Sequence, residues 1–570
     1  MIPPAPKRWQ VLSPSPASQT VTGTDIPSLL VQILYNRGIT DTESMELFLT
    51  HEETAPPFQM GGMSEAVGRI RRAIKKSERI AVYGDYDADG VTATALMVET
   101  LSALGGRVTW HIPSRGDSGY GLNRPALDQI ARNGVTLIVT VDCGVRALSE
   151  LRYAARLGLD VIVTDHHTVG DTLPPAWAII NPKQSGCPYP FREFSGVGLA
   201  FKLAQGLLRA ENQVPLKKRR RGLHEDDLLD LVALGTVADL VPLVGENRWL
   251  VAHGLERLRQ TQRPGLQKLM QLAGVDPNHV DSEAVGYRLG PRINAAGRLA
   301  SAATSLRLLI TSDEEEAGQL AQELDELNRK RQKLTGEMVE LALNKLGDTT
   351  ADILIVEDRL IPEGLMGLVA SSLVEVYYRP AIAISKGDEV SRGSARSIQE
   401  FHITEALDRC AHHFVRHGGH AMAAGFTIRN DELAPFRADI ETLASRWLAD
   451  QDLCPALVVD AEIPLAEATP DLCAELRRLA PFGYGNQTPV LASSAVDVKS
   501  HFRVGAKGKH LKLYLANSDS GRTWEGIGFG LGDWNDTLPD RIDVAYHLEI
   551  NRWNNEARLQ LNIQDLRPAS

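Results

Sequence analysis

Asp85, Asp87 and Asp89 place three carboxylates within five residues of the sequence Tyr83-Gly84-Asp85-Tyr86-Asp87-Ala88-Asp89-Gly90. An apolar run precedes this segment and a helical pattern follows it. Acids this close repel one another, which raises at least one pKa unless a cation neutralises them. One interpretation is therefore a divalent-cation site. The other is a polar turn that only looks like a calcium loop.

Acids and imidazoles also follow the next two apolar runs. Asp142 ends one run, and the triplet Asp165-His166-His167 ends the next. Apolar runs that alternate with amphipathic helices predict a parallel sheet covered on both faces. A single acid at a strand end is most often a helix cap. Three successive parallel strands, however, deliver their side chains to one edge of the sheet, so we expect these groups to share one crevice.

A fourth acid, Asp239, lies at the end of the helical segment Leu234–Leu240. The helix dipole disfavours an anion there unless a positive charge compensates it. Carboxylates with imidazole and without thiolate favour Mn²⁺ or Mg²⁺ over structural zinc. Five or more such ligands exceed what one ion takes while keeping room for water and substrate. The usual solution in phosphatases and nucleases is two ions about 3.5–4 Å apart.

Residues 312–347 form the clearest single element of the sequence. Apolar side chains repeat at three-and-four spacing, Ser312 with Glu315 is typical of a capping box, and Gly347 is typical of a helix end. At 1.5 Å per residue this helix would be about 50 Å long and could join two domains. A second α/β unit follows, with expected strands at 353–356 and 381–384 around a helix at 365–377.

The segment from about Pro455 onward has short strands with period-two patterning. Between positions 499 and 524 basic and aromatic residues alternate against one acid, Asp519: Lys499, Phe502, Arg503, Lys507, Lys509, Lys512, Tyr514, Arg522 and Trp524. Small barrels with a basic face and aromatic side chains bind single strands, and each stacked base contributes about 1–3 kcal/mol. The alternative, a solvated edge with aromatics in the core, is equally compatible with this stretch.

Composition limits the class of protein. The chain has 570 residues, 43% hydrophobic and 23% charged, which excludes disorder as the main state and predicts three or four domains. The net charge of −11 argues against a nucleic-acid partner unless basic groups cluster locally. Five cysteines without a C-x-x-C pair support neither a disulfide framework nor a thiolate zinc site. Without a membrane-length apolar run or a secretory signal, we expect a cytoplasmic protein.

The acidic and histidine motifs, in their order, resemble the four motifs of the DHH phosphoesterase superfamily. Gly290–Arg298 resembles the motif special to the RecJ branch of that superfamily. Gly393–Ser397 and Gly418–Gly425 resemble the substrate-binding motifs of the associated DHHA1 domain, and Pro481–Asn486 is similar to the entry into the RecJ OB domain. The resemblance covers roughly residues 50 to 570.

This resemblance implies the fold and the domain order. It implies an α/β protein with a parallel-sheet DHH domain joined by a long helix to a smaller α/β DHHA1 domain, followed by a β-barrel OB domain. The expected boundaries are a helical N-terminal region at 1–70, the DHH domain at 71–310, the helix at 311–348, DHHA1 at 349–450 and OB at 455–570.

The resemblance also implies the activity. It implies an exonuclease that is specific for single-stranded DNA, works from a 5′ end and releases mononucleotides with two Mn²⁺ or Mg²⁺ ions, in recombination and repair. The implied partners are single-stranded DNA, a single-strand-binding protein and a helicase. Two alternatives stay open: a DHH hydrolase for short oligonucleotides or cyclic dinucleotides, which would not need a third domain, and a non-catalytic DNA scaffold, which would not need intact metal ligands.

Residue roles follow from the matched motifs. The implied metal ligands are Asp85, Asp87, Asp89, Asp142, His166 and Asp239, with Asp142 bridging. Asp165 would orient the neighbouring histidine, His167 would face the scissile phosphate, and Arg292 would stabilise its charge. Ser394 and Arg396 would hold the terminal phosphate, with Asn294, Arg298, Gly418, Gly419 and His420 as further substrate contacts. The DNA-binding set is Arg503, Lys507, Lys509, Lys512, Tyr514 and Trp524.

Two further groups are not assigned to the site. The basic run Lys217–Arg221 is expected to form a solvated loop, with a phosphate contact as the minority interpretation. His412 and His413 have no third ligand at useful spacing in the sequence and are expected to be surface groups.

Overall fold

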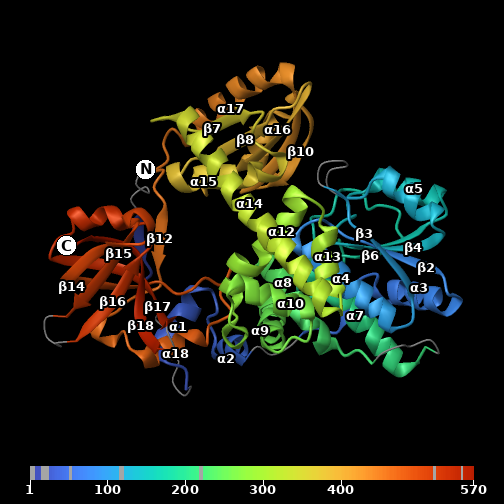
Figure 1. Ribbon diagram of the computed structural model, residues 1–570, viewed down its shortest axis with the longest axis horizontal. Helices are drawn as coiled ribbons and strands as arrows, with labels where there is room; N and C mark the ends of the chain where they lie inside the picture. Colours follow the sequence, from blue (N-terminus) through green and yellow to red (C-terminus); the bar gives the residue numbers. More distant parts are fainter. Residues whose placement is uncertain are drawn as a thin grey trace.

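The computed structural model describes residues 7–14, 25–50, 54–114, 121–216, 222–517, 522–553 and 556–569. The run Lys217–Arg221 and Asp519 lie outside the described residues. Figure 1 shows two α/β domains joined by one long helix, and a β-barrel beside them. We call these the first α/β domain, the second α/β domain and the barrel domain. The predicted fold class is confirmed.

The first α/β domain is built on a five-stranded parallel sheet in the order β3-β2-β4-β5-β6. Alternate residues of β2 face opposite sides: Ile80 and Val82 join the core under α3, α4 and α7, and Ala81 and Tyr83 join the core under α5 and α6. Both faces are therefore covered, as predicted. The strands are β2 Arg79–Tyr83, β3 Arg107–His111, β4 Val135–Val141, β5 Asp160–Thr164 and β6 Ala178–Ile180. The helices are α3 Met63–Lys76, α4 Ala88–Ala103, α5 Arg124–Arg132, α6 Leu148–Arg156 and α7 Gly196–Gln213.

A helical layer completes this domain. Its central helix, α8 (Leu229–Ala238), is almost entirely buried against α4 and α9 and carries Asp239 at its end. A single π-helical turn, Val285–Leu289, leads into α12. The remaining helices are α9 Gly245–Arg259, α10 Pro264–Ala273, α11 Ser282–Ala284, α12 Gly290–Leu299 and α13 Ala303–Ile310.

The long helix α14 spans Glu314–Leu346, about 50 Å at 1.5 Å per residue. Its N-cap is Asp313, whose side chain accepts the Glu315 and Glu316 N–H groups, so the predicted cap at Ser312 is wrong by one residue. The first half packs on α10 and α12, and Ala342 in the second half joins the core of the second α/β domain. The helix therefore contacts both domains that it joins (Figure 1).

The second α/β domain has a five-stranded mixed sheet in the order β10-β11-β9-β8-β7, in which only β7 and β8 are parallel. The strands β10 and β11 form a hairpin at one edge, and β10 is the outermost strand. The strands are β7 Leu354–Asp358, β8 Ala381–Ser385, β9 Val390–Arg396, β10 Phe414–His420 and β11 Ala423–Arg429. The helices are α15 Met366–Tyr377, α16 Ile403–Arg409 and α17 Leu433–Leu448.

The barrel domain closes because β14 pairs with both β15 and β17, which gives a closed ring in the order β14-β15-β16-β18-β17. Its core contains Leu511, Leu513, Tyr546 and Trp524. The elements are β12 Ala456–Val459, β13 Ala461–Glu462, α18 Pro470–Arg477, β14 Leu491–Val504, β15 His510–Ala516, β16 Thr523–Gly528, β17 Arg541–Trp553 and β18 Glu556–Pro568.

The N-terminal residues do not form one separate region. β1 (Arg8–Val11) pairs with β12, and apolar residues of α1 (Ser28–Asn36) and α2 (Thr42–Thr50) join the barrel core. α3, in contrast, belongs to the core of the first α/β domain. The predicted boundary at residue 70 therefore falls inside α3. The chain start packs on its last domain because the amphipathic helices bury their apolar face there.

Candidate active site

The loop after β2 and the first turn of α4 bring Asp85 and Asp89 into the interior of the first α/β domain, where they are 2% and 1% exposed. A Cβ on Gly90 would lie 2.7 Å from the Asp85 backbone, so only glycine permits this turn. Asp87 caps α4 by accepting the Gly90 N–H at 3.0 Å. The segment thus holds the three carboxylates at the carboxyl end of β2, as predicted.

Asp89 is held by the N-terminus of α7. Its two carboxylate oxygens accept the N–H groups of Gly196 at 2.5 Å and Val197 at 2.8 Å. Burial, and then the charge of Asp87, nevertheless raise the pKa of Asp89 to about 7. Burying this carboxylate beside another is therefore costly unless a cation lies next to it.

Asp142 lies directly after β4 with a left-handed backbone, φ +60°. A Cβ on Gly196 would lie 2.5 Å from the Asp142 Cβ, so α7 approaches this closely only because position 196 is glycine. Burial, and then Asp89, Asp87 and Asp239, raise the pKa of Asp142 well above its usual range. Asp142 therefore occupies the centre of the acidic cluster.

His166 lies between two of these acids. Its Nε2 is 3.2 Å from Asp142 Oδ1 and 3.6 Å from Asp239 Oδ2. Burial lowers the pKa of His166 to about 3, so the imidazole is neutral and offers a lone pair. Among the described residues, neither His166 Nε2 nor the buried Asp239 Oδ2 has a hydrogen-bond partner. Buried, unsatisfied acceptors of this kind are what a divalent cation would satisfy.

The six predicted metal ligands, together with His167, fall into three overlapping groups, each with its ligand atoms within 4.8 Å of one another. The groups are Asp85–Asp87–Asp142, Asp142–His166–His167 and Asp89–His166–Asp239. Asp142 and His166 each belong to two groups. The donor set is carboxylate and imidazole, which fits Mn²⁺ or Mg²⁺, and it is larger than one ion uses. The residues therefore fit two neighbouring ions.

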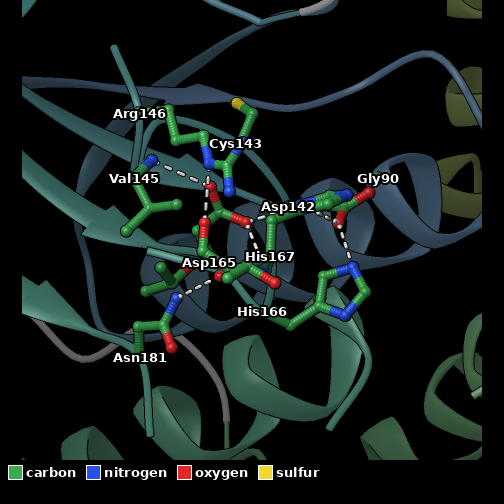
Figure 2. Close-up of polar contacts among 12 residues, drawn as sticks. Gly90, Asp142, Cys143, Val145, Arg146, Asp165, His166, His167 and Asn181 are labelled. Atoms are coloured by element: carbon green, nitrogen blue, oxygen red, sulfur yellow. Dashed lines mark hydrogen bonds and ion pairs between the residues drawn. The ribbon is translucent and has the colours of Figure 1, made fainter. Parts of the chain in front are cut away.

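Asp165 orients His167, the second histidine of the triplet (Figure 2). Its Oδ1 accepts His167 Nδ1 at 2.7 Å and the His167 backbone N–H at 3.0 Å, and its Oδ2 accepts the Val145 N–H at 2.8 Å. Burial alone would lower the pKa of His167, but the hydrogen bond to Asp165 and the charges of Asp165, Asp87 and Asp89 together raise it. His167 is thus held by Nδ1 and can carry a proton at Nε2.

Two residues of the segment Gly290–Arg298 contact the backbone of the loop after β2 and the first turn of α4, which together carry the first three acids. Asn294 Oδ1 accepts the Ala88 N–H at 2.8 Å, and a Cβ on Gly297 would lie 2.3 Å from the Tyr86 carbonyl oxygen. Asn294, predicted to bind substrate, therefore positions the loop that carries Asp87 and Asp89.

Two arginines of the same helix have partners within the protein. Arg292 donates to Asp325 on α14 at 2.9 Å and to the Arg288 carbonyl at 2.7 Å. Arg298 donates to the Gly364 carbonyl of the second α/β domain at 3.0 Å. Arg298 thus bridges the two domains, and the predicted phosphate contact of Arg292 stays a prediction.

Ser394 and Arg396 lie together on one face of β9, as their alternation predicted. Arg396 Nη1 donates to Ser394 Oγ at 3.3 Å. A Cβ on Gly367 would lie 2.8 Å from Arg396 Nη2, so the pair packs against the first turn of α15. A guanidinium, a hydroxyl and a helix N-terminus together suit a phosphate group.

His420 ends β10 on the side of the second α/β domain that faces the acidic cluster. Burial, and then the charges of His167, Lys183 and Arg146, lower its pKa. The two domains therefore bring His167 and His420 near one another. Gly419 is required for the tight hairpin, since its Cβ would lie 2.3 Å from the Ala423 carbonyl oxygen, whereas a Cβ on Gly418 would meet nothing within 4 Å.

The barrel domain corrects part of the predicted DNA-binding set. Trp524 is only 3% exposed and donates through Nε1 to the Ala468 carbonyl at 2.8 Å, so its ring is part of the core and stacks no base. Lys512 is paired with Glu525, and Arg503 with Asp536.

Other members of that set remain accessible. Lys507 and Lys509 are exposed. Tyr514 lies beside the half-exposed ring of Phe502, with ring centroids 6.4 Å apart. The accessible part of the predicted face is therefore the Phe502–Tyr514 pair with these two lysines.

Lys183 is a functional candidate that the sequence analysis did not single out. It follows β6 at the same edge of the sheet, and its Nζ lies 3.8 Å from Glu193. Burial and the charges of Asp89 and Asp87 raise the pKa of Asp239 well above its usual range, and the charge of Lys183 partly opposes this rise. β6 has only three residues, which is too short for its apolar pattern to be noticed. The usable signal was position, since the residue follows the strand next to β5.

The fold and the acidic cluster define a phosphoesterase of the DHH type, and comparison with known proteins agrees. The chain matches the DHH family, N-terminal domain, over residues 79–236, the DHHA1 domain over 335–446 and the RecJ OB domain over 459–565.

Relatives that match nearly the whole of this chain show which branch of the DHH superfamily it belongs to. The chain is 40% identical to the single-stranded-DNA-specific exonuclease RecJ of Bacillus subtilis, over 98% of this chain and 70% of that protein. It is 35% identical to RecJ of Escherichia coli, over 95% of this chain and 96% of that protein. The crystal structure of Thermus thermophilus RecJ in complex with Mn²⁺ superposes with a TM-score of 0.84 at 32% identity, covering 99% of this chain and 80% of that one. The chain belongs to the RecJ family.

Proposed function

We propose that this protein is a metal-dependent exonuclease that hydrolyses single-stranded DNA from the 5′ end and releases 5′-mononucleotides in DNA recombination and repair. The observation that carries the proposal is the buried carboxylate–imidazole centre of the first α/β domain together with a guanidinium–hydroxyl pair, Arg396 with Ser394, on the second α/β domain. Relatives named single-stranded-DNA-specific exonuclease RecJ support the substrate.

The six predicted ligands Asp85, Asp87, Asp89, Asp142, His166 and Asp239 would hold two Mn²⁺ or Mg²⁺ ions, with Asp142 shared between them. When bound, such ions supply a nucleophile at neutral pH and stabilise the charge on the reacting phosphate. The protein contributes rigidity, because Gly90 and Gly196 allow the backbone to approach Asp85 and Asp142 closely. A small shift of these carboxylates would therefore reduce the rate strongly.

His167 and Asp165 act together beside this centre. Asp165 fixes the His167 ring through Nδ1, which leaves Nε2 to hold or donate a proton at the scissile phosphate or its leaving oxygen. Lys183 adds positive charge on the same side and offsets the surplus of carboxylates. These groups would stabilise the additional negative charge that develops on the singly charged phosphodiester as its bond breaks.

Recognition of the terminus falls to the second α/β domain. Arg396 and Ser394 over the first turn of α15 offer charge-assisted hydrogen bonds to a terminal phosphate, which carries more charge than an internal one. A terminal anchor at a fixed distance from the cutting site selects chain ends. It also sets the length of the released product.

The two alternatives are less well supported. A hydrolase for dinucleotides does not need a barrel domain with an exposed Phe502–Tyr514 pair and exposed lysines. A non-catalytic scaffold does not need the complete set of ligands.

The decisive experiment compares long single strands with dinucleotides in Mn²⁺, using strands that carry the label at either end. The proposal expects labelled mononucleotide at once from 5′-labelled strands and only late from 3′-labelled strands, and little hydrolysis of dinucleotides. The matched control is Asp142→Asn. Faster cleavage of dinucleotides would favour the small-substrate alternative, and no cleavage of either substrate would favour the scaffold.

We further propose that a single-strand-binding protein and a helicase are partners and that the protein works in the cytoplasm. None of the described helices is long and apolar enough to cross a bilayer. Purified single-strand-binding protein should raise the rate on long strands. Recovery of the protein with the membrane fraction would contradict the location.

A further inference from the structure

A second cluster of imidazoles and carboxylates lies in the second α/β domain, just before β10. His412 and His413 form the end of the turn Ala411–His413, and Asp439 lies on α17. Nε2 of His413 is 3.0 Å from Asp439 Oδ2, and Nε2 of His412 is 3.6 Å from the same oxygen. The expectation that the two histidines lack a third ligand is therefore wrong, because the fold brings Asp439 to them from 26 residues away.

The spacing suits one cation. The three ligand atoms lie within 4.8 Å of one another. In a tetrahedral zinc site with bonds of about 2.0–2.1 Å, ligand atoms are about 3.3 Å apart, close to the two separations above. His413 is buried, whereas the side chains of His412 and Asp439 are 64% and 54% exposed. A cation there would have three protein ligands and a fourth position open to water.

Glu432 supplies an independent feature of metal sites. Its Oε2 lies 2.6 Å from His413 Nδ1, the ring nitrogen opposite the cluster. Histidine ligands usually donate this second N–H to a carboxylate, which fixes the tautomer and directs the other nitrogen at the metal. Glu432 comes from a different element, the turn Asn430–Glu432, so three segments meet at this point.

We propose that His412, His413 and Asp439 form a transition-metal site separate from the catalytic centre, with Zn²⁺ as the fitting ion. Two imidazoles and one carboxylate suit Zn²⁺ better than Mg²⁺, which prefers an all-oxygen set. The bound ion would join the start of β10 to α17. β10 is an edge strand whose other end carries His420, so the ion would stabilise the strand that presents His420 to the catalytic domain.

A competing interpretation needs no metal. Burial alone lowers the pKa of His413, but hydrogen bonds to Asp439 and Glu432 outweigh it and raise the pKa. His413 could then be an imidazolium held between two carboxylates. In that case His412, which makes only the longer contact, would have no part in the cluster.

The test measures Zn²⁺ bound per chain by the full-length protein in excess Mg²⁺, which fills the catalytic centre. The variants are His412→Ala and Glu432→Gln, and the matched control is His417→Ala, a histidine of β10 that pairs with Asp408 on α16. We expect His412→Ala to lose one Zn²⁺ equivalent and Glu432→Gln to bind that equivalent about 10–100-fold more weakly. The control should bind as the unchanged protein does.

Co²⁺ substitution supplies a second readout. The unchanged protein should show the strong visible absorption of a tetrahedral Co²⁺ site, and His412→Ala should lack it while His417→Ala keeps it. Because His412 is largely exposed, its replacement should leave the fold intact, which circular dichroism checks. Equal Zn²⁺ binding and equal Co²⁺ absorption by His412→Ala and the control would overturn the proposal in favour of the imidazolium.

Discussion

The carboxyl edge of the parallel sheet and the basic face of the barrel differ in how their charged side chains are neutralised. At the sheet edge, Asp89 and Asp142 are buried next to other carboxylates, and their pKa values are raised. On the barrel, Lys512 pairs with Glu525 and Arg503 with Asp536. The sheet edge is therefore electrostatically incomplete without cations, whereas the barrel pairs two of its basic side chains with its own carboxylates.

The difference follows from topology. Parallel strands end at one edge, so residues that follow three neighbouring strands converge whatever their side-chain direction within the strand. Barrel strands alternate between the core and solvent, so half of the residues in a basic and aromatic stretch point inward. Buried acids without a compensating positive charge therefore indicate the site of the chemistry. Basic surface residues that are paired with acids indicate a surface that only supports binding.

The largest effect should come from Asp142→Asn, which removes the shared ligand and should abolish measurable hydrolysis. Asparagine tolerates the left-handed backbone at this position. A raised pKa in an acid means that stability is lost as pH rises toward that pKa, so the neutral amide should leave the metal-free protein at pH 8 as stable as the unchanged one, or more so. Nuclease assays and thermal unfolding in EDTA check both expectations. Near-normal turnover by a folded Asp142→Asn variant would contradict the proposal that two ions share Asp142.

Trp524→Ala should lower the free energy of unfolding of the barrel domain by about 3–5 kcal/mol, because it removes a core ring. Denaturant unfolding followed by a probe in the barrel measures this loss. The control is Phe502→Ala on the exposed face, which should leave stability nearly unchanged and weaken binding of long strands by about 1–3 kcal/mol. If Trp524→Ala instead weakened binding and Phe502→Ala lowered stability, Trp524 would be a residue that stacks on bases.

Arg396→Ala should slow hydrolysis of 5′-phosphorylated strands about 10- to 100-fold, the loss expected for one charge-assisted hydrogen bond of about 1.5–3 kcal/mol. Strands with a 5′ hydroxyl should be affected much less. Rates for both substrates and both proteins are compared, with Arg392→Ala as the control, since Arg392 lies on the same strand but pairs with Glu363. An equal loss on the two substrates would assign the terminal phosphate to other groups.

The smallest effect should come from replacing Lys507 and Lys509 by alanine. Each phosphate contact contributes about 0.7 to the salt slope for a single strand, so the slope should fall by at most about 1.4. Binding titrations at several salt concentrations measure it. Lys512→Ala should change the slope less than either exposed lysine, because Glu525 already neutralises Lys512. An unchanged slope for the double variant would place the DNA path away from this face.

The sequence was informative where local pattern and topology agree. The acids after β2, β4 and β5, the triplet around His166 and the alternation of Ser394 with Arg396 needed only strand periodicity and the shared edge. Trp524 was misassigned because period-two patterning shows alternation without showing which face is buried.

Other roles depend on tertiary contacts that the spacing of residues along the sequence does not reveal. Asn294 holds the loop at Ala88 across 206 residues, and Asp439 approaches His413 from α17. Lys183 follows a strand too short to leave a pattern. The start of the chain was assigned to a separate region because nothing in α1 or α2 indicates which domain receives their apolar face.

The central claim is that two cations share Asp142 at the carboxyl edge of the sheet. Anomalous diffraction from crystals soaked in Mn²⁺ tests it directly. We predict two peaks about 3.5–4 Å apart, both in contact with the Asp142 carboxylate and one of them with His166. A single peak, or two peaks that leave Asp142 without a metal contact, would contradict the account.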